Sequence, residues 1–180
     1  WPADERPLLA AWGKVRSAVP DARLIIAPHE PTDSHLTPIE RWAAEARVRN
    51  ARLGSDAAPN ADVVIVDRVG VLGDLYALAD VAYVGGGFHA AGLHSVLEPA
   101  AFGAPVLFGP PFTMSRDAAL LVRNHGGASA SDSAAPARQM SDWLARPEER
   151  RVAGARANAL VLSGLGAAER SYNLVCALLA

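Results

Sequence analysis

Cysteine, lysine and long apolar runs are scarce in this chain of 180 residues. Its one cysteine, Cys176, lies in the apolar stretch NLVCALLA, which predicts a buried thiol in a reducing compartment rather than a nucleophile or a metal ligand. Lys14 is the only lysine and the formal net charge is −2, so we expect no basic surface that holds nucleic acid. No apolar run approaches the roughly 20 residues that span a bilayer, and the amino end is not a signal peptide. These absences predict a soluble chain that does not bind nucleic acid.

The composition predicts one folded domain over residues 1–180. Apolar residues make up 51% of the chain and charged residues 20%, which is enough to bury a sizeable core. The chain starts with Trp1 and Pro2, followed by the helix-start residues Asp4 and Glu5. We therefore expect a chain that begins in mid-fold, as a fragment of a larger protein does.

Helical and strand-like segments alternate along the sequence. Apolar residues at helical spacing predict helices at 3–18, 37–46, 115–124, 134–145, 148–162 and 167–179, and the segment 70–79 is predicted to be a turn followed by a short helix. Short apolar runs predict strands at 23–27, 48–53, 62–67, 81–84, a run ending at 108, and 127–130. This order predicts an α/β fold with a doubly wound, Rossmann-like parallel sheet, because crossover connections are right-handed. Such a sheet binds ligands at the carboxyl ends of its strands, here the loops 28–31, 68–74, 85–95 and 109–115.

A run of three glycines follows the predicted strand 81–84. Gly85, Gly86 and Gly87 remove every Cβ where the backbone turns, so a ligand can come close, and Gly86 and Gly87 are candidate binding residues. The run leads into a polar loop instead of opening a helix as G-x-G-x-x-G does, so the dinucleotide fingerprint is absent. A zinc site built on His89 and His94 lacks the usual ligand pattern, and we expect no metal.

Two other strand ends carry residues with an ordinary and a functional interpretation. His29 and Glu30 follow the strand 23–27 and either contact a ligand or form a solvated turn between prolines. Asp74 either caps a helix at 75–78 or stands, with Gly73, where backbone N–H groups face a phosphate. The sequence leaves both choices open.

The string from Ser95 to Glu98 also has two interpretations. Serine followed three residues later by glutamate is a capping box, which would engage both side chains at a helix start. A helix that begins at Pro99 would instead leave Glu98 free to accept hydrogen bonds from a diol such as a ribose. His94 could then donate to a phosphate or carboxylate.

The segment VGVLGDLYALADVAYVGGGFHAAGLHSVLEPAAFGAPVLFGP, residues 69–110, resembles a known family. It is similar to the carboxyl-terminal half of 3-deoxy-D-manno-octulosonic acid (Kdo) transferases, which are GT-B glycosyltransferases with a G-E-L motif, a Y-x-x-A-D-x-A-F-V-G-G strand and an H-N-P-L-E-P-A helix start. The resemblance begins at Trp1 and runs in order to Pro110, over half of the chain.

This resemblance implies a function and a set of partners. Such enzymes transfer Kdo from CMP-Kdo to a lipid A precursor in lipopolysaccharide core synthesis, with inversion and without a metal or other cofactor. The amino-terminal domain, absent from this chain, carries the general base, the membrane attachment and most of the acceptor surface. The resemblance thus implies a donor-binding domain, inactive alone, from an enzyme on the cytoplasmic side of the bacterial inner membrane.

The family's CMP-binding motifs fall on three strings of this chain. They are Pro28 and His29, then Leu72, Gly73 and Asp74, then Ser95, Val96, Leu97 and Glu98. The resemblance implies that amides near Gly73 and Ser95 meet the cytidine and the phosphate, and that Glu98 meets the ribose hydroxyls.

This chain departs from the family at three of those positions. His29 stands where many members have arginine, which turns a permanent cation into an imidazole whose charge depends on pH. Asp74 replaces a glutamate and Ser95 an asparagine. Two alternatives stay open: a GT-B enzyme that uses a UDP or GDP sugar, and a nucleotide-binding or interaction module without catalysis.

Overall fold

Six short strands form two parallel groups in a computed structural model that describes residues 1–88, 92–110, 112–130 and 134–179. The first group has the order β1-β3-β2, with bounds Leu24–Ile26, Val63–Ile65 and Asn50–Arg52. The second has the order β4-β5-β6, with bounds Ala82–Val84, Val106–Phe108 and Gly127–Ser129. All four pairings are parallel, as predicted. The central strands β3 and β5 are buried along their whole length, because helices and loops cover both of their faces.

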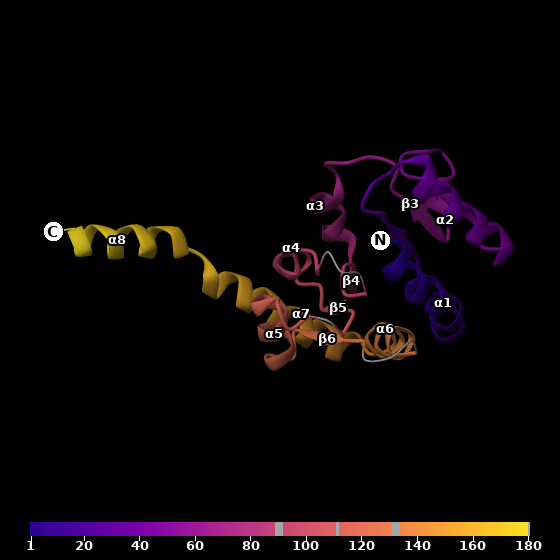
Figure 1. The fold of residues 1–180 in the computed structure, drawn as a ribbon. Helices are drawn as coiled ribbons and strands as arrows, with labels where there is room; N and C mark the ends of the chain where they lie inside the picture. The colour runs from indigo at the N-terminus through magenta and orange to yellow at the C-terminus, as the bar shows by residue number, and fades with distance from the viewer. Residues whose placement is uncertain (89–91, 111, 131–133, 180) are drawn as a thin grey trace.

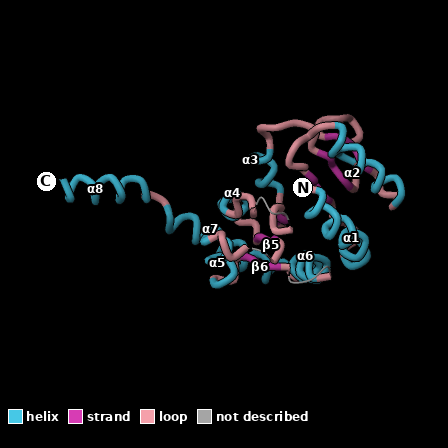
Figure 2. Tube along the Cα trace, viewed as in Figure 1, coloured by secondary structure: helices cyan, strands magenta, loops and turns pink. Residues whose placement is uncertain are grey.

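The helices alternate with these strands along the chain (Figures 1 and 2). Their bounds are α1 Pro2–Ala18, α2 Asp33–Glu45, α3 Leu72–Leu75, α4 Leu97–Ala101, α5 Arg116–Arg123, α6 Ala135–Ala145, α7 Pro147–Gly164 and α8 Ala167–Leu179. Two short 3-10 turns are η1 Ala58–Asn60 and η2 Tyr76–Leu78. Most boundaries lie within a few residues of the predicted ones, since apolar spacing and proline positions are clear in these segments.

Helix α2 begins earlier than predicted, at Asp33 rather than Thr37. Thr32 is extended and precedes the helix, and its hydroxyl lies 2.8 Å from Ser34 Oγ and 2.9 Å from His35 Nδ1. Pro38 therefore lies inside the helix rather than at its start. The polar residues before Pro38 had the composition of a loop, and their side-chain hydrogen bonds instead organise the first turn.

Helix α1 packs against both strand groups. Its buried Leu8, Trp12 and Val15 belong to one core cluster with Ile65 of β3 and Leu107 of β5. It also lies along α6, which comes late in the chain (Figure 1). Since burial of apolar side chains is the main stabilising contribution to a fold, this helix joins the two strand groups into one core.

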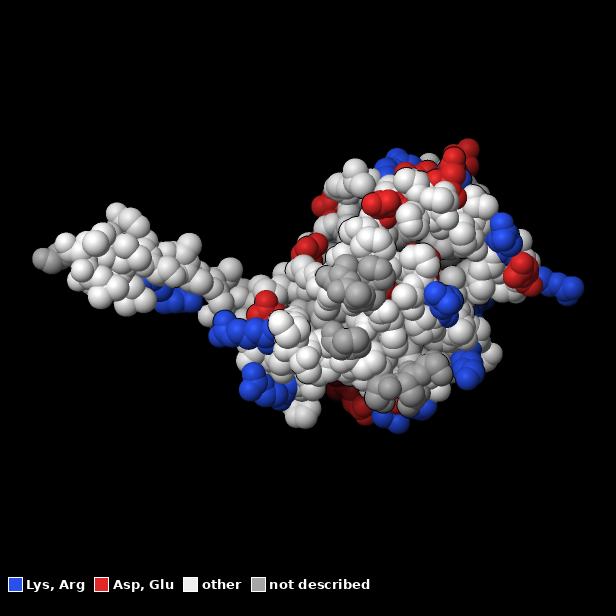
Figure 3. All heavy atoms as spheres, in the orientation of Figure 1, with Lys and Arg blue, Asp and Glu red and all other residues white. Residues whose placement is uncertain are grey.

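Helix α8 extends away from the rest of the molecule as an almost uncharged arm (Figure 3). Its large apolar side chains, Tyr172, Leu174, Val175, Leu178 and Leu179, are all exposed. Cys176 is exposed as well, so the prediction of a buried thiol was wrong. Apolar neighbours in sequence indicate burial only when the helix has a surface to pack on, and this arm does not pack on the core.

Candidate functional site

Rings from three segments meet at the carboxyl edge of the strands. His29 follows β1, and its ring stacks on that of Trp1, with centroids 4.1 Å apart, and on that of His94, with centroids 4.9 Å apart. His94 lies between β4 and α4, and its backbone N–H donates to the Gly85 carbonyl at 3.1 Å. The structure therefore brings together two predicted site residues, His29 and His94, from the two strand groups.

Glu98 lies close to the segment that follows α3. Helix α3 continues directly into η2, and η2 contacts α4. Burial raises the pKa of the Tyr76 phenol in η2, and the charge of the nearby Glu98 raises it further. The segment Leu72–Leu78, which contains Asp74, therefore lies against the helix that contains Glu98.

The glycine turn after β4 is tied to the first turn of α1. Asp4 is only 2% exposed, and its Oδ1 accepts a hydrogen bond from the Phe88 backbone N–H at 2.9 Å. The same carboxyl lies against Gly85, where an added Cβ would stand 3.6 Å from it. Tyr83 donates a hydrogen bond to the Asp4 carbonyl at 3.4 Å. Burial and the nearby Asp4 raise the pKa of the Tyr83 phenol, so Tyr83 stays a donor.

Gly86 and Gly87 are buried, and their backbones are crowded by other backbone segments. An added Cβ at Gly86, which has φ +93°, would collide with the Gly92 carbonyl oxygen. An added Cβ at Gly87 would collide with the backbone of Gly109, at the end of β5. The glycines allow close approach, but the groups that approach them in this structure are backbone segments of the chain rather than the predicted ligand.

Helix α4 starts in neither of the two ways that the sequence suggested. It begins at Leu97 after Val96, and no side chain of the described residues caps it, so Ser95 and Glu98 form no capping box. Pro99 is the third helical residue rather than the first. Proline fits there because the first turn of a helix has no intrahelical acceptor for its N–H groups. Glu98 is consequently exposed and not engaged at the cap.

Asp74 does not cap a helix at 75–78 either. Helix α3 begins at Leu72 after Val71, and Asp74 is its third residue. Leu72, Gly73 and Asp74 are all exposed on this single turn. The short helix includes Gly73, and glycine has low helix propensity. The helix start predicted from the sequence was therefore three residues too late.

The remaining predicted site residues divide into exposed and buried ones. His29, Glu30, His94 and Ser95 are exposed at the rim, where a ligand can reach them. Pro28 and Val96 are buried, and Leu97 is half-buried. Pro28, Val96 and Leu97 can shape the rim through packing and backbone groups. His89 lies outside the described residues.

Sequence reasoning missed Asp4 and Tyr76 as parts of this site. Asp4 was interpreted only as a helix-start residue, and its first-turn position in α1 is indeed typical of acidic residues. Its contact with Phe88 joins residues far apart in sequence, which no local pattern reveals. The apolar neighbours of Tyr76 in the sequence likewise gave no indication that its side chain lies near Glu98.

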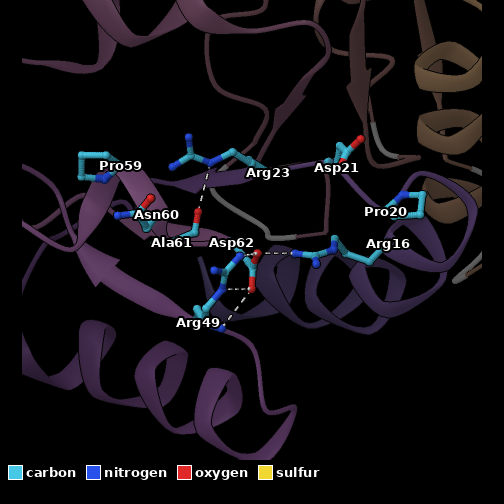
Figure 4. A pocket seen from close by; sticks show the side chains of 10 residues that line it. Arg16, Pro20, Asp21, Arg23, Arg49, Pro59, Asn60, Ala61 and Asp62 are labelled. Carbon is cyan, nitrogen blue, oxygen red and sulfur yellow. Dashed lines mark hydrogen bonds and ion pairs between the residues drawn. The ribbon is translucent and has the colours of Figure 1, made fainter.

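Two cavities of the structure lie away from this rim. One, of about 320 Å³, is at the amino ends of β1 and β3 and is lined by Arg16, Arg23, Arg49 and Asp62 among others (Figure 4). Asp62 forms ion pairs with Arg16 at 2.8 Å and with Arg49 at 2.9 Å. Hydrogen bonds from both hold the pKa of this carboxyl well below its ordinary value. These charges are paired with each other, so the cavity has the features of a structural ion-pair cluster.

The second cavity is about 400 Å³ and lies beside α1, between Trp12 and Trp42. None of the predicted site residues lines either cavity. Among the residues that the structure describes, no cluster of three or more His, Cys, Asp or Glu side chains could hold a metal ion. The described helices include none long and apolar enough to cross a membrane.

Comparison with known proteins identifies relatives of this chain. It is 32% identical over 163 residues to the 3-deoxy-D-manno-octulosonic acid transferase of Bordetella pertussis, a match that covers 88% of this chain. The chain is a relative of the Kdo transferases. A second member, from Aquifex aeolicus (strain VF5), is 31% identical over 103 residues and 57% of this chain. The resemblance seen in the sequence is therefore confirmed, and no family model matches the chain.

The match covers part of each Kdo transferase. The aligned regions span 37% of the Bordetella pertussis protein and 28% of the Aquifex aeolicus protein. A solved structure, the C-terminal CMP-Kdo binding domain of WaaA from Acinetobacter baumannii, superposes with a TM-score of 0.74 at 22% identity. That superposition covers 85% of this chain and 80% of the other. It confirms the predicted α/β, Rossmann-like fold.

Proposed function

We propose that this chain is the donor-binding domain of a Kdo transferase and holds the CMP part of CMP-Kdo at the carboxyl edge of its strands. The observation that carries the proposal is the similarity to Kdo transferases over 88% of the chain. The likeness of its fold to a CMP-Kdo binding domain supports it. The edge, rather than either cavity, is the proposed site because ligands of doubly wound sheets bind there and because the exposed polar residues converge there.

Each residue of the rim has a physical role in this proposal. The exposed Glu98 carboxylate accepts hydrogen bonds from the ribose hydroxyls, since two oxygens on one side chain suit a vicinal diol. His29 and His94 face the phosphate, and the buried turn at Gly86 and Gly87 packs against the backbone at Gly92 and Gly109 and so supports the loop that carries His94. The exposed turn that includes Asp74 stands beside the base.

The complete enzyme would use this domain to stabilise the leaving group. An acceptor hydroxyl of a lipid A precursor attacks the anomeric carbon of Kdo while the bond to the CMP phosphate breaks, with inversion and without a metal. Positive charge at the rim stabilises the phosphate that leaves. A glutamate of the amino-terminal domain takes the proton of the acceptor hydroxyl, and that domain makes the membrane contact on the cytoplasmic side of the inner membrane. The present chain alone should bind CMP and transfer nothing.

Calorimetric titration of the 180-residue chain with CMP, UMP and GMP tests the proposal. We expect binding of CMP in preference to the other two. Glu98→Ala should weaken CMP binding by about 10- to 100-fold, because hydrogen bonds to a charged group contribute about 1.5 to 3 kcal/mol. Glu45→Ala is the matched control, since Glu45 is an exposed glutamate at the end of α2.

Three outcomes would contradict the proposal in different ways. A preference for UMP or GMP would favour an enzyme that uses another nucleotide sugar. Absence of binding to all three nucleotides would favour an interaction module. Equal affinity of the Glu98→Ala and wild-type chains for CMP would remove Glu98 from the site.

A further inference from the structure

Two imidazole rings are stacked on each other at the rim. His29 and His94 come from the loops after β1 and β4, and their ring centroids are 4.9 Å apart with an interplanar angle of 26°. Both side chains are exposed, so solvent protons and a ligand can reach them. Histidine is the side chain whose charge changes near neutral pH. Two such rings in contact therefore form a unit whose charge depends on both pH and ligand.

Repulsion opposes a second positive charge on this pair. Two cations about 5 Å apart near a protein surface repel each other appreciably, because solvent screens them only in part. The His94 side chain is exposed, but its ring is partly desolvated by its neighbours, which lowers the pKa of the imidazole, and the proximity of His29 lowers it further. The carboxylates of Asp4 and Glu98 oppose this shift.

An anion bound at the edges of the two rings would reverse this balance. A phosphate oxygen can accept an N–H donor from each imidazolium, and its negative charge offsets the repulsion between them. The His29 ring stacks on Trp1 and on His94, so the nitrogens at the ring edges are the groups that an anion can reach, and the backbone hydrogen bond from His94 to Gly85 holds the His94 main chain beside the glycine turn. Binding of an anion at this pair and protonation of the pair would therefore favour each other.

We propose that His29 and His94 form a proton-linked phosphate site, so that the chain takes up protons when it binds CMP and binds it more tightly as the pH falls. This inference rests on the proposed function, since it concerns the phosphate of the same nucleotide. If binding takes up one proton, the affinity falls about tenfold per pH unit in the pH range between the pKa of the free site and that of the bound site, by the same linkage that applies to folding. Between pH 6 and pH 8 the affinity of the wild-type chain should therefore fall by about tenfold or more.

The experiment is calorimetric titration with CMP at several pH values, and near neutral pH in two buffers of unlike ionisation enthalpy. The difference in apparent enthalpy between the buffers gives the number of protons taken up. The control is His29→Arg, because arginine keeps its charge over this range and can still bind phosphate. The CMP phosphate itself titrates at about pH 6, and the His29→Arg variant measures this contribution to proton uptake, because the same phosphate binds to both chains.

The wild-type chain should take up roughly one proton more than the His29→Arg variant, whose affinity should stay high at pH 8. His94→Gln should also take up fewer protons than the wild-type chain, since the partner ring is gone. Equal proton uptake and equal pH dependence in the wild-type and His29→Arg chains would overturn this inference while leaving the proposed function in place. Absence of CMP binding to the wild-type chain at every pH would overturn the proposed function, and this inference with it.

Discussion

Asp4→Ala is expected to destabilise the domain through the glycine turn. Asp4 is 2% exposed and its Oδ1 accepts the Phe88 N–H at 2.9 Å, so alanine leaves that donor without a partner inside the protein. An unsatisfied buried donor costs about 1 to 3 kcal/mol. For a chain of this length, 1 kcal/mol corresponds to about 2 to 4 °C in Tm, so the melting temperature should fall by about 2 to 12 °C.

Thermal unfolding followed by circular dichroism measures this effect. Asp4→Asn keeps an oxygen in the acceptor position and should lose about 1 kcal/mol or less. Asp56→Ala provides the control, because Asp56 is exposed in the loop between β2 and β3. If Asp4→Ala melts at the same temperature as Asp56→Ala, the hydrogen bond to Phe88 does not stabilise the turn and the reasoning is refuted.

Two further predictions concern the same fold. Gly86→Ala should destabilise the chain by about 3 kcal/mol or more, because alanine is strained in the left-handed backbone and its Cβ would collide with the Gly92 carbonyl. Gly92→Ala should cost only about 1 to 2 kcal/mol, because Gly92 has φ +90° but open space around it. Equal urea midpoints for the two variants would contradict the predicted collision. Because Arg49 and Arg16 lower the pKa of Asp62 in the folded state, its contribution to stability is present above about pH 4 and is lost as the pH falls further. Asp62→Asn should therefore be less stable at neutral pH and lose less stability between about pH 4 and pH 2, a difference that parallel acid-unfolding curves would disprove.

Much of the fold follows from local patterns in the sequence. The strand Val63–Ile65 is a short apolar run, and α7 begins at Pro147, a residue type that is favoured at a helix start. Such signals act over a few residues, and the structure agrees with them. Burial of α8 depends instead on whether the rest of the molecule offers a surface for it to pack on. Composition does not reveal this, and the predicted burial of Cys176 was therefore wrong.

The topology predicts that the loops of the candidate site meet at one edge, whereas the contacts between them could not be predicted. Parallel strands direct their carboxyl ends to one edge, so the convergence of the loops with His29 and Glu98 follows from topology. The stacking of His29 on His94 and the hydrogen bond from Phe88 to Asp4 depend on how far each loop reaches across the rim. The start of α4 at Leu97 shows the same limit, because two plausible local signals competed there and neither determined the result.

The packing of α1 against both strand groups bears on the order in which the chain folds. Leu8, Trp12 and Val15 find apolar partners in β3 and β5, and α1 lies along α6 near the other end of the domain. During synthesis this helix leaves the ribosome long before α6 is made, so its apolar face stays exposed until the later segments can pack on it. Contacts of such long sequence separation slow folding, because a large loop closes before they form. We therefore expect cooperative folding that is completed only after α6 has been synthesised, and chains cut before α6 should be prone to aggregation and to capture by chaperones.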